Sequence, residues 1–378
     1  MRILLLSAYD AVSHRQWREG LVAALPEHDW TVLALPPRHF RWRIRGNSLS
    51  WGVGERSILN QQFDCLVATS MVDLASLKGL IPSLAKVPSL VYFHENQFDY
   101  PVSYTAHQGN DPQVVNLYTA LAANQLVFNS NYNQQTFLVG TSTFLKKMPD
   151  AVPAGIVDVL AAKSTVMPVP LADDWFTSIQ PDKTNELTIV WNHRWEYDKA
   201  PEIFFQALRL LLERKVSFRV HVLGQAFRTV PDMFTEMREL LVDHLGQWGR
   251  VEDREAYRNC LQQSHLVVST ARHDFQGLAV LEALDAGCIP VVPDRIAYPE
   301  WFAPEFRYPS TLEDSEREAQ QLADKLTALA VQLKRNQLPA VPDVSNLSWS
   351  VLQDPYRKLS LIHISEPTRL VHSSRMTS

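Results

Sequence analysis

Residues 187–201 read LTIVWNHRWEYDKAP. A short apolar run of strand length, LTIVWN, ends in a polar loop, and a helical pattern follows at 200–215. This strand–loop–helix unit restarts an alternation that the first part of the chain has already completed. The expected strands of the first series are 2–7, 31–35, 64–69, 89–93 and 125–129, and those of the second are 187–192, 218–223, 265–270 and 289–293.

Alternation of strands and helices predicts parallel sheets that carry helices on both faces. Because the series occurs twice, we expect an α/β fold of two Rossmann-like, doubly wound domains that face each other across a cleft. The expected domains are residues 1–170 and 184–340, joined by a polar, proline-containing linker at 168–183. Residues 341–358 are expected to return to the first domain as a final helix.

The composition is that of a globular protein with a full core, because 46% of the 378 residues are hydrophobic and 20% are charged. The net charge of −5 means that any contact with nucleic acid must come from a local basic patch. The cysteines are Cys65, Cys260 and Cys288, which are odd in number and lack CxxC spacing. They indicate buried thiols in a reducing compartment rather than disulfides or a zinc site.

The two ends of the chain predict no targeting or membrane segment. The apolar run at 2–7 is better explained as a buried strand than as a secretory signal, and no run approaches the roughly 18 residues of a membrane span. We therefore expect a cytoplasmic protein. Residues 359–369, LSLIHISEPTR, resemble the translation of a sequencing-library adaptor, so 359–378 are expected to be an assembly artefact or a disordered tail.

Two loops that follow expected strands carry the chemistry. In 272–287, RHDFQGLAVLEALDAG, Gly277 opens a helix whose first amides suit an anion, and Glu282 lies where it could accept bonds from sugar hydroxyls. On the spacing alone, an acidic cap at Asp274 with a surface Glu282 is the better explanation. Arg194 and Lys199 suit a diphosphate, because both supply positive charge to a departing phosphate, although ion pairs with Glu196 or Asp198 are the alternative.

Together these loops resemble the donor site of the glycosyltransferase family 4-like group, which has the GT-B fold. Five segments, one of them in the loop after 187–192, resemble the tRNA-queuosine α-mannosyltransferase family in collinear order from Met1 to about Lys358: SHRQW (13–17), FRWR (40–43), YFHENQFDYP (92–101), FNSNYN (128–133) and HRWEYDK (193–199). Some members carry a Gly-Gly pair before the SH motif, whereas this chain has Asp10-Ala11-Val12. The glycosyltransferase family 4-like group usually has Glu at the position of Asp274.

The resemblance implies the roles of individual residues. Arg194 and Lys199 would bind the diphosphate, Asp274 and Glu282 would bind sugar hydroxyls, and His94 would contact the transferred hexose. A structural histidine, turn formers at Asn96 and Gln97, and an N-cap at Ser13 are the alternatives. WGRV at 248–251 lies where relatives hold the nucleobase. The predicted donor contacts also include Ser13, His14, Gly249, Val251, Phe275, Gln276, Gly277 and Leu278.

The implied reaction is transfer of mannose from GDP-mannose to the cyclopentenediol of queuosine in tRNA, with retention, without a metal and without a cofactor. The basic run PPRHFRWRIR (36–45) is the candidate tRNA surface, because its aromatic residues could stack on bases while four arginines meet phosphates. A solvated loop is the alternative. Other possible functions are transfer to a lipid, glycan or small molecule, a non-catalytic nucleotide-sugar or RNA-binding protein, and a sugar epimerase.

Overall fold

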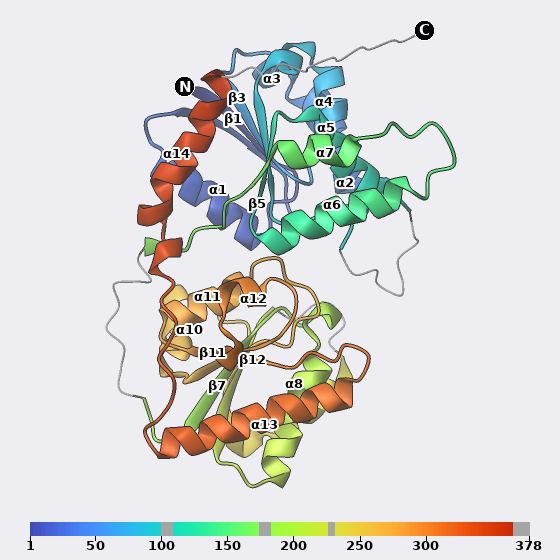
Figure 1. Cartoon of the computed structure of the whole chain (residues 1–378). Coiled ribbons are helices and arrows are strands. Elements are labelled where there is room, and N and C mark those ends of the chain that lie inside the picture. Colours follow the sequence, from blue (N-terminus) through green and yellow to red (C-terminus); the bar gives the residue numbers. More distant parts are fainter. Residues whose placement is uncertain (100–108, 174–182, 226–230, 366–378) are drawn as a thin grey trace. The chain divides into compact units, whose positions relative to one another are not determined.

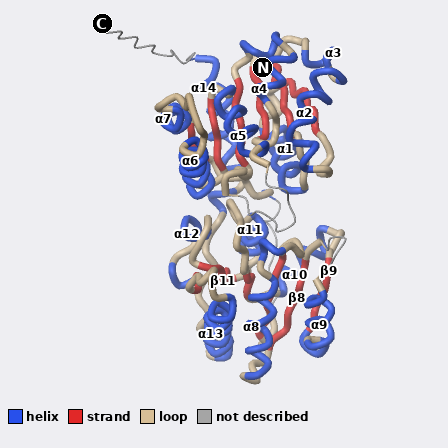
Figure 2. The backbone as a smooth tube through the Cα atoms, turned by 90° about the vertical axis from the view of Figure 1, so that its right-hand side faces the viewer, coloured by secondary structure: helices blue, strands red, loops and turns tan. Residues whose placement is uncertain are grey.

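The computed structural model describes residues 1–99, 109–173, 183–225 and 231–365 (Figure 1). The chain divides into two compact units, and each is described by itself. Unit 1 comprises Met1–Pro168 with Leu352–Ser378, and unit 2 comprises Val169–Val351. Of the expected linker, 174–182 lie outside the described residues. In each unit a central layer of strands is covered by helices on both faces (Figure 2).

Unit 1 contains a six-stranded sheet in the order β2-β1-β3-β4-β5-β6, with every neighbouring pair parallel. The strands are β1 Arg2–Ser7, β2 Asp29–Ala34, β3 Cys65–Thr69, β4 Ser89–Phe93, β5 Gln125–Phe128 and β6 Ser164–Val166. The helices are α1 Val12–Ala24, α2 Phe40–Gly54, α3 Arg56–Leu59, α4 Leu74–Leu80, α5 Asp111–Ala122, α6 Asn131–Leu145 and α7 Ile156–Ala162. The helix α14, Trp349–Ser365, joins unit 1 from Leu352 onward.

Unit 2 repeats the architecture with the order β12-β11-β10-β7-β8-β9, also parallel throughout. Its strands are β7 Leu187–Asn192, β8 Phe218–Leu223, β9 Leu245–Gly249, β10 Leu266–Val268, β11 Ile289–Pro293 and β12 Arg307–Tyr308. Its helices are α8 Pro201–Glu213, α9 Asp232–Leu240, α10 Arg254–Gln263, α11 Leu278–Asp285, α12 Tyr298–Trp301 and α13 Ser315–Lys334. The predicted α/β class with two doubly wound sheets is confirmed.

Most of the predicted strands are buried, and β1 and β7 match their predicted bounds to the residue. The edge strand β2 is also predicted, although it is only partly buried. The strands that the sequence misses lie toward the edges of the sheets and are short or weakly apolar. The edge strand β9 reads LGQWG and is partly exposed, while β6 and β12 have only three and two residues. Edge strands bury less surface, so their sequences carry a weaker apolar signal.

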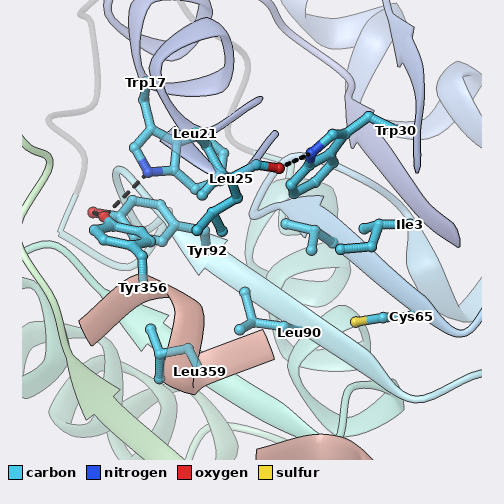
Figure 3. A pocket seen from close by; sticks show the side chains of 11 residues that line it. Ile3, Trp17, Leu21, Leu25, Trp30, Cys65, Leu90, Tyr92, Tyr356 and Leu359 are labelled. Atoms are coloured by element: carbon cyan, nitrogen blue, oxygen red, sulfur yellow. Dashed lines mark hydrogen bonds between the residues drawn. The ribbon is translucent and has the colours of Figure 1, made fainter. Parts of the chain in front are cut away.

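The helix α14 closes an apolar cavity of about 30 Å³ in unit 1, between α1 and the strands β1, β3 and β4 (Figure 3). The Trp17 indole donates to the Tyr356 hydroxyl at 3.1 Å, and that hydroxyl donates to the carbonyl of Pro168 at 2.9 Å. Leu359 lines the cavity and is buried. α14 thus continues past Lys358 into the expected tail, of which 366–378 lie outside the described residues.

Candidate active site

In unit 2, the two loops with predicted donor residues follow the neighbouring strands β7 and β10. Ile189 and Val190 pair with Leu266 and Val267. The chain continues from β7 to β8 on one side, whereas β10 leads to β11 on the other. The order of the strands therefore reverses between β7 and β10, and ligands of open α/β sheets bind beyond the carboxyl ends of strands at such a point.

The buried ammonium of Lys199 joins the two loops. Its Nζ donates to the carbonyl of His273 at 2.6 Å and lies 3.2 Å from an Asp198 oxygen and 3.6 Å from Asp274 Oδ2. The Lys199 carbonyl in turn accepts a bond from the Thr270 hydroxyl at 2.7 Å. One buried cation between two carboxylates fixes the spacing of both loops.

Asp274 is ionised and holds the turn that precedes α11. Burial alone would raise the pKa of Asp274, but the Lys199 ammonium and smaller contributions, among them the Gly277 amide, together outweigh it and the pKa is lowered. Its Oδ1 accepts the Gly277 amide at 2.9 Å. The alternative of an acidic cap at Asp274 is wrong, because the N-cap of α11 is Gly277 and the helix has no side-chain cap hydrogen bond.

Gly277 is required at the start of α11 for two reasons. Its φ of +80° lies in the left-handed region, and a Cβ there would come within 2.8 Å of the Tyr298 ring. The Gln276 amide is engaged with both backbone groups of Val169, at 2.8 and 2.9 Å, and Phe275 is buried with its ring edge-on to His273. Within α11, the Val280 amide donates to the carbonyl of Gly277 at 2.9 Å. The two amides that precede it, of Leu278 and Ala279, suit an anion.

Glu282 is half-buried and belongs to a chain of polar contacts. Asn192, the last residue of β7, donates to the Tyr257 hydroxyl at 3.0 Å and to the carbonyl of Ala279 at 2.8 Å. The Tyr257 hydroxyl donates to Glu282 Oε2 at 3.4 Å. Burial raises the pKa of the Glu282 carboxyl to about 7, so its charge changes near neutral pH. Neither Asn192 nor Tyr257 is among the predicted site residues.

Arg194 is half-exposed, with 51% of its side chain accessible, and its guanidinium lies 3.0 Å from Glu196. The ion pairs that were the alternative for Arg194 and Lys199 are therefore both present. A donor diphosphate would have to compete with the Glu196 carboxylate for the Arg194 guanidinium.

His193 is a further polar residue of this loop that sequence reasoning missed. It is 4% exposed, and its Nε2 has no hydrogen-bond partner within the described part of the chain. Burial and the nearby Lys199 lower the pKa of His193 to about 4, so the ring is neutral at physiological pH. Its only signal in the sequence was its place beside Arg194.

The predicted nucleobase contacts lie at the end of β9. Gly249 has a φ of +96°, and its carbonyl accepts the Gly224 amide at 3.3 Å. Val251 is half-buried and packs against the core of unit 2. Their backbone contact with a base stays a prediction.

In unit 1, His14 and His94 lie together beyond β1 and β4. Their rings stack at 4.2 Å between centroids and 21° between planes, and Trp17 meets His94 edge-on at 4.9 Å. His14 Nδ1 is bonded to the carbonyl of Tyr9 at 2.8 Å, and its Nε2 lies 3.5 Å from Glu95. Both predicted histidines thus belong to one buried cluster.

The pKa values of the two histidines are shifted in opposite directions. Burial would lower the pKa of His14, but the Glu95 carboxylate outweighs it and the pKa is raised. Burial and the neighbouring His14 hold the pKa of His94 well below its usual range. The Nε2 of His94 has no hydrogen-bond partner among the described residues, so a neutral imidazole stands ready for an additional polar contact.

Three minor predictions can be assigned. Ser13 is not an N-cap, because α1 begins at Val12 and its N-cap is Ala11. Asn96 forms a turn, since its Oδ1 accepts the amides of Phe98 and Asp99 at 3.0 and 3.1 Å. The buried Gln97 donates its backbone amide to Asn116 at 2.8 Å. Residues 100 and 101 of the motif YFHENQFDYP lie outside the described residues.

Within the described ranges, no group of three or more His, Cys, Asp or Glu side chains is placed to hold a metal ion. The described helices include none that is both long and apolar enough to cross a membrane.

Comparison with known proteins identifies the family. A family model for the tRNA-queuosine alpha-mannosyltransferase N-terminal region matches residues 2–171, and one for glycosyl transferases group 1 matches 174–337. A protein of Drosophila melanogaster named tRNA-queuosine alpha-mannosyltransferase is 32% identical over 315 residues, which are 81% of this chain and 83% of the relative. This chain belongs to the tRNA-queuosine alpha-mannosyltransferase family.

Solved structures agree on the fold. A glycosyltransferase from Rickettsia africae ESF-5 has a TM-score of 0.61 and 14% identity over 97% of this chain and 99% of its own. HepE of Anabaena, in complex with UDP, has a TM-score of 0.58 and 13% identity over 96% of this chain and 100% of its own. The predicted GT-B fold is confirmed, and this member of the family is a glycosyltransferase, an enzyme that transfers a hexose.

Proposed function

We propose that this chain transfers mannose from GDP-mannose to the cyclopentenediol of queuosine in tRNA, with retention and without a metal or other cofactor. The observation that carries the proposal is the contact of Lys199 with Asp274 at the strand reversal between β7 and β10, in a loop that also carries Arg194. The name of the Drosophila relative supports mannose and queuosine tRNA. The reaction belongs in the cytoplasm.

Positive charge at the diphosphate is the first requirement of such a transfer. As the bond between the sugar and the phosphate breaks, negative charge grows on the leaving phosphate. The half-exposed Arg194 would exchange its ion pair with Glu196 for contacts with the phosphate oxygens. The buried ammonium of Lys199 would add a second positive charge near the diphosphate. These two cations and the amides that open α11 supply the charge for which other transferases use a metal ion.

Recognition of the donor sugars falls to the carboxylates. Glu282, held by Tyr257, would accept bonds from the ribose hydroxyls. Asp274 would face the hexose, where its shorter arm leaves less reach than the usual Glu. Since Lys199 keeps Asp274 ionised, the carboxylate remains an acceptor at neutral pH.

Retention follows from attack on the same face. The acceptor hydroxyl forms the new bond to the anomeric carbon while the bond to the phosphate breaks, and the leaving phosphate takes the hydroxyl proton. No nucleophile from the protein is needed. In this scheme the neutral His94 contacts the hexose near the reacting carbon and does not act as a charged acid, because its pKa is low.

The test is a panel of donors. Queuosine-containing tRNA is incubated with the protein and with GDP- and UDP-sugars in turn, and the masses of the nucleosides released from the tRNA are measured by mass spectrometry. The proposal predicts a hexose mass gain on queuosine with GDP-mannose. No gain with any donor defeats it, and a gain on a lipid or glycan instead supports the alternative acceptor class. Loss of turnover with EDTA and recovery with a divalent ion would contradict metal independence.

A further inference from the structure

The basic run at 36–45 is split between a loop and the first turns of α2. Two of its members turn inward, since Phe40 meets Tyr9 edge-on at 5.9 Å and Arg43 is buried. Arg38, Arg41 and Trp42 are exposed. The exposed surface is therefore smaller than the four arginines and two aromatic rings that the sequence predicts, because Phe40 and Arg43 are not part of it.

The indole of Trp42 is held against its own helix. A Cβ on Gly46, one turn later, would lie 2.7 Å from the indole Cζ2, so the ring lies over the bare backbone of Gly46. Gly46 is buried by this contact, while Trp42 remains 55% exposed. A flat ring fixed on one face and open on the other offers stacking area at little entropic cost.

The charges beside this ring are not neutralised. Within the described residues, neither Arg38 nor Arg41 has a carboxylate at ion-pair distance, whereas Arg45 lies 3.4 Å from Asp73 and 4.0 Å from Asp111. Two uncompensated cations beside an open indole form a local basic patch in a chain of net charge −5. This combination suits a polyanion with exposed bases.

The patch also lies near the histidine cluster of unit 1. Phe40 packs on Tyr9, whose carbonyl is bonded to His14 at 2.8 Å. The loops after β1 and β2 are joined by the Asp10 amide, which donates to the carbonyl of Leu35 at 3.0 Å. Asn47 anchors α2 to the loop after β3 through Met71 and Asp73. The patch is thus a fixed part of the edge of the sheet where His14 lies.

We propose that Arg38, Arg41 and Trp42, here called the α2 platform, bind a single-stranded part of the acceptor tRNA, with one unpaired base stacked on Trp42 and the arginines on adjacent phosphates. The inference rests on the proposed function for its choice of RNA. The exposed Leu49 and Val53 continue the row along α2, as in a helix that binds lipid. RNA is favoured because the uncompensated cations flank the ring and Leu49 lies two turns away.

Binding of queuosine-containing tRNA to the full chain tests the stacking. Trp42→Ala should weaken binding about 10-fold, because stacking of one base on an aromatic ring has an effect of this order. Trp42→Phe should retain most of the affinity. The matched control is Tyr118→Ala, which removes another exposed aromatic ring of unit 1, on α5, and should leave the affinity unchanged.

Gly46→Ala provides a second variant that keeps the helix. Alanine is a better helix former than glycine, so the melting temperature of the variant should not fall. The alanine Cβ must nevertheless displace the Trp42 indole. The affinity for tRNA should fall in this variant as well. Arg38→Ala with Arg41→Ala should reduce the slope of log affinity against log salt by about 1.5. The control, Lys334→Ala with Arg335→Ala at the C-terminal end of α13, should leave the slope unchanged.

The outcomes separate this inference from the proposed function. If all variants of the platform bind tRNA as the wild type does, and the wild type still adds hexose to tRNA, the platform is wrong and the function stands. If tRNA binding depends on Trp42 but no donor yields hexose transfer, the function is wrong and the platform stands. Loss of binding to phosphatidylserine vesicles in Trp42→Ala, with tRNA binding intact, overturns the platform and assigns it to a lipid surface.

Discussion

The two polar clusters of this chain occupy equivalent places in their sheets but differ in charge. In unit 2, Lys199 is a buried cation held between the carboxylates of Asp198 and Asp274. In unit 1, the stacked rings of His14 and His94 are packed among aromatic side chains, and His94 is neutral. Both clusters lie beyond the carboxyl ends of parallel strands.

This difference indicates that unit 2 binds the charged part of the donor, its diphosphate. A diphosphate carries its negative charge into the site, and in the proposed function Arg194 and Lys199 of unit 2 are the cations that receive it. The hexose and the queuosine cyclopentenediol are uncharged polyols, which suit neutral acceptors and donors such as His94. We therefore expect charge-removing substitutions to act mainly through unit 2.

The largest effect is expected from Arg194→Ala. Loss of the exposed guanidinium should lower kcat/KM for the nucleotide sugar by about 100- to 1,000-fold, because its charge is needed in the transition state. Thermal melting should be unchanged, since Arg194 is half-exposed. Arg209→Ala, which removes a partly exposed arginine of α8, is the control. Unchanged turnover in Arg194→Ala would remove its role at the diphosphate.

Lys199→Met should instead reduce stability. The substitution leaves two carboxylates without their buried cation, and the free energy of unfolding should fall by about 3 kcal/mol in denaturant titrations. Adding Asp274→Asn should restore part of the loss, because one uncompensated charge is removed. A double variant that is less stable than Lys199→Met would contradict the pairing.

These two residues show how far the sequence could lead. The alternation of strands and helices, repeated in both halves of the chain, predicts the fold, and the strand at 187–192 places Arg194 and Lys199 in the loop that follows it. The roles of Asn192 and Tyr257 were not predictable. Asn192 reaches Glu282 only through the Tyr257 hydroxyl, and these contacts join β7, α10 and α11, which are distant in the sequence. The inward turn of Arg43 likewise depends on tertiary packing of α2.

Glu282 should make GDP binding dependent on pH. The pKa of its carboxyl is about 7, so it becomes a better acceptor for ribose hydroxyls as the pH rises. We expect affinity for GDP to increase up to about tenfold between pH 6 and 8. In Glu282→Gln the dependence should be lost. An equally steep profile in that variant would assign the titration to another group.

The smallest effect is expected from Glu95→Gln in unit 1. The raised pKa of His14 means that its protonation stabilises the fold below its unfolded pKa, and this contribution is lost as the pH rises through the folded value. Removing the Glu95 charge should therefore lower the free energy of unfolding by about 1 kcal/mol at pH 6 and by less at pH 8. Equal losses at both pH values would exclude a charged pair.

Calorimetric titration of GDP into the wild type, Arg194→Ala and His94→Ala tests the central claim most directly, because GDP carries the diphosphate without the hexose. If unit 2 receives the donor charge, Arg194→Ala should weaken GDP binding by roughly 100-fold, as expected for loss of a bidentate charged contact. His94→Ala should bind GDP as the wild type does. Unchanged GDP binding in Arg194→Ala, with binding lost in His94→Ala, would contradict the account.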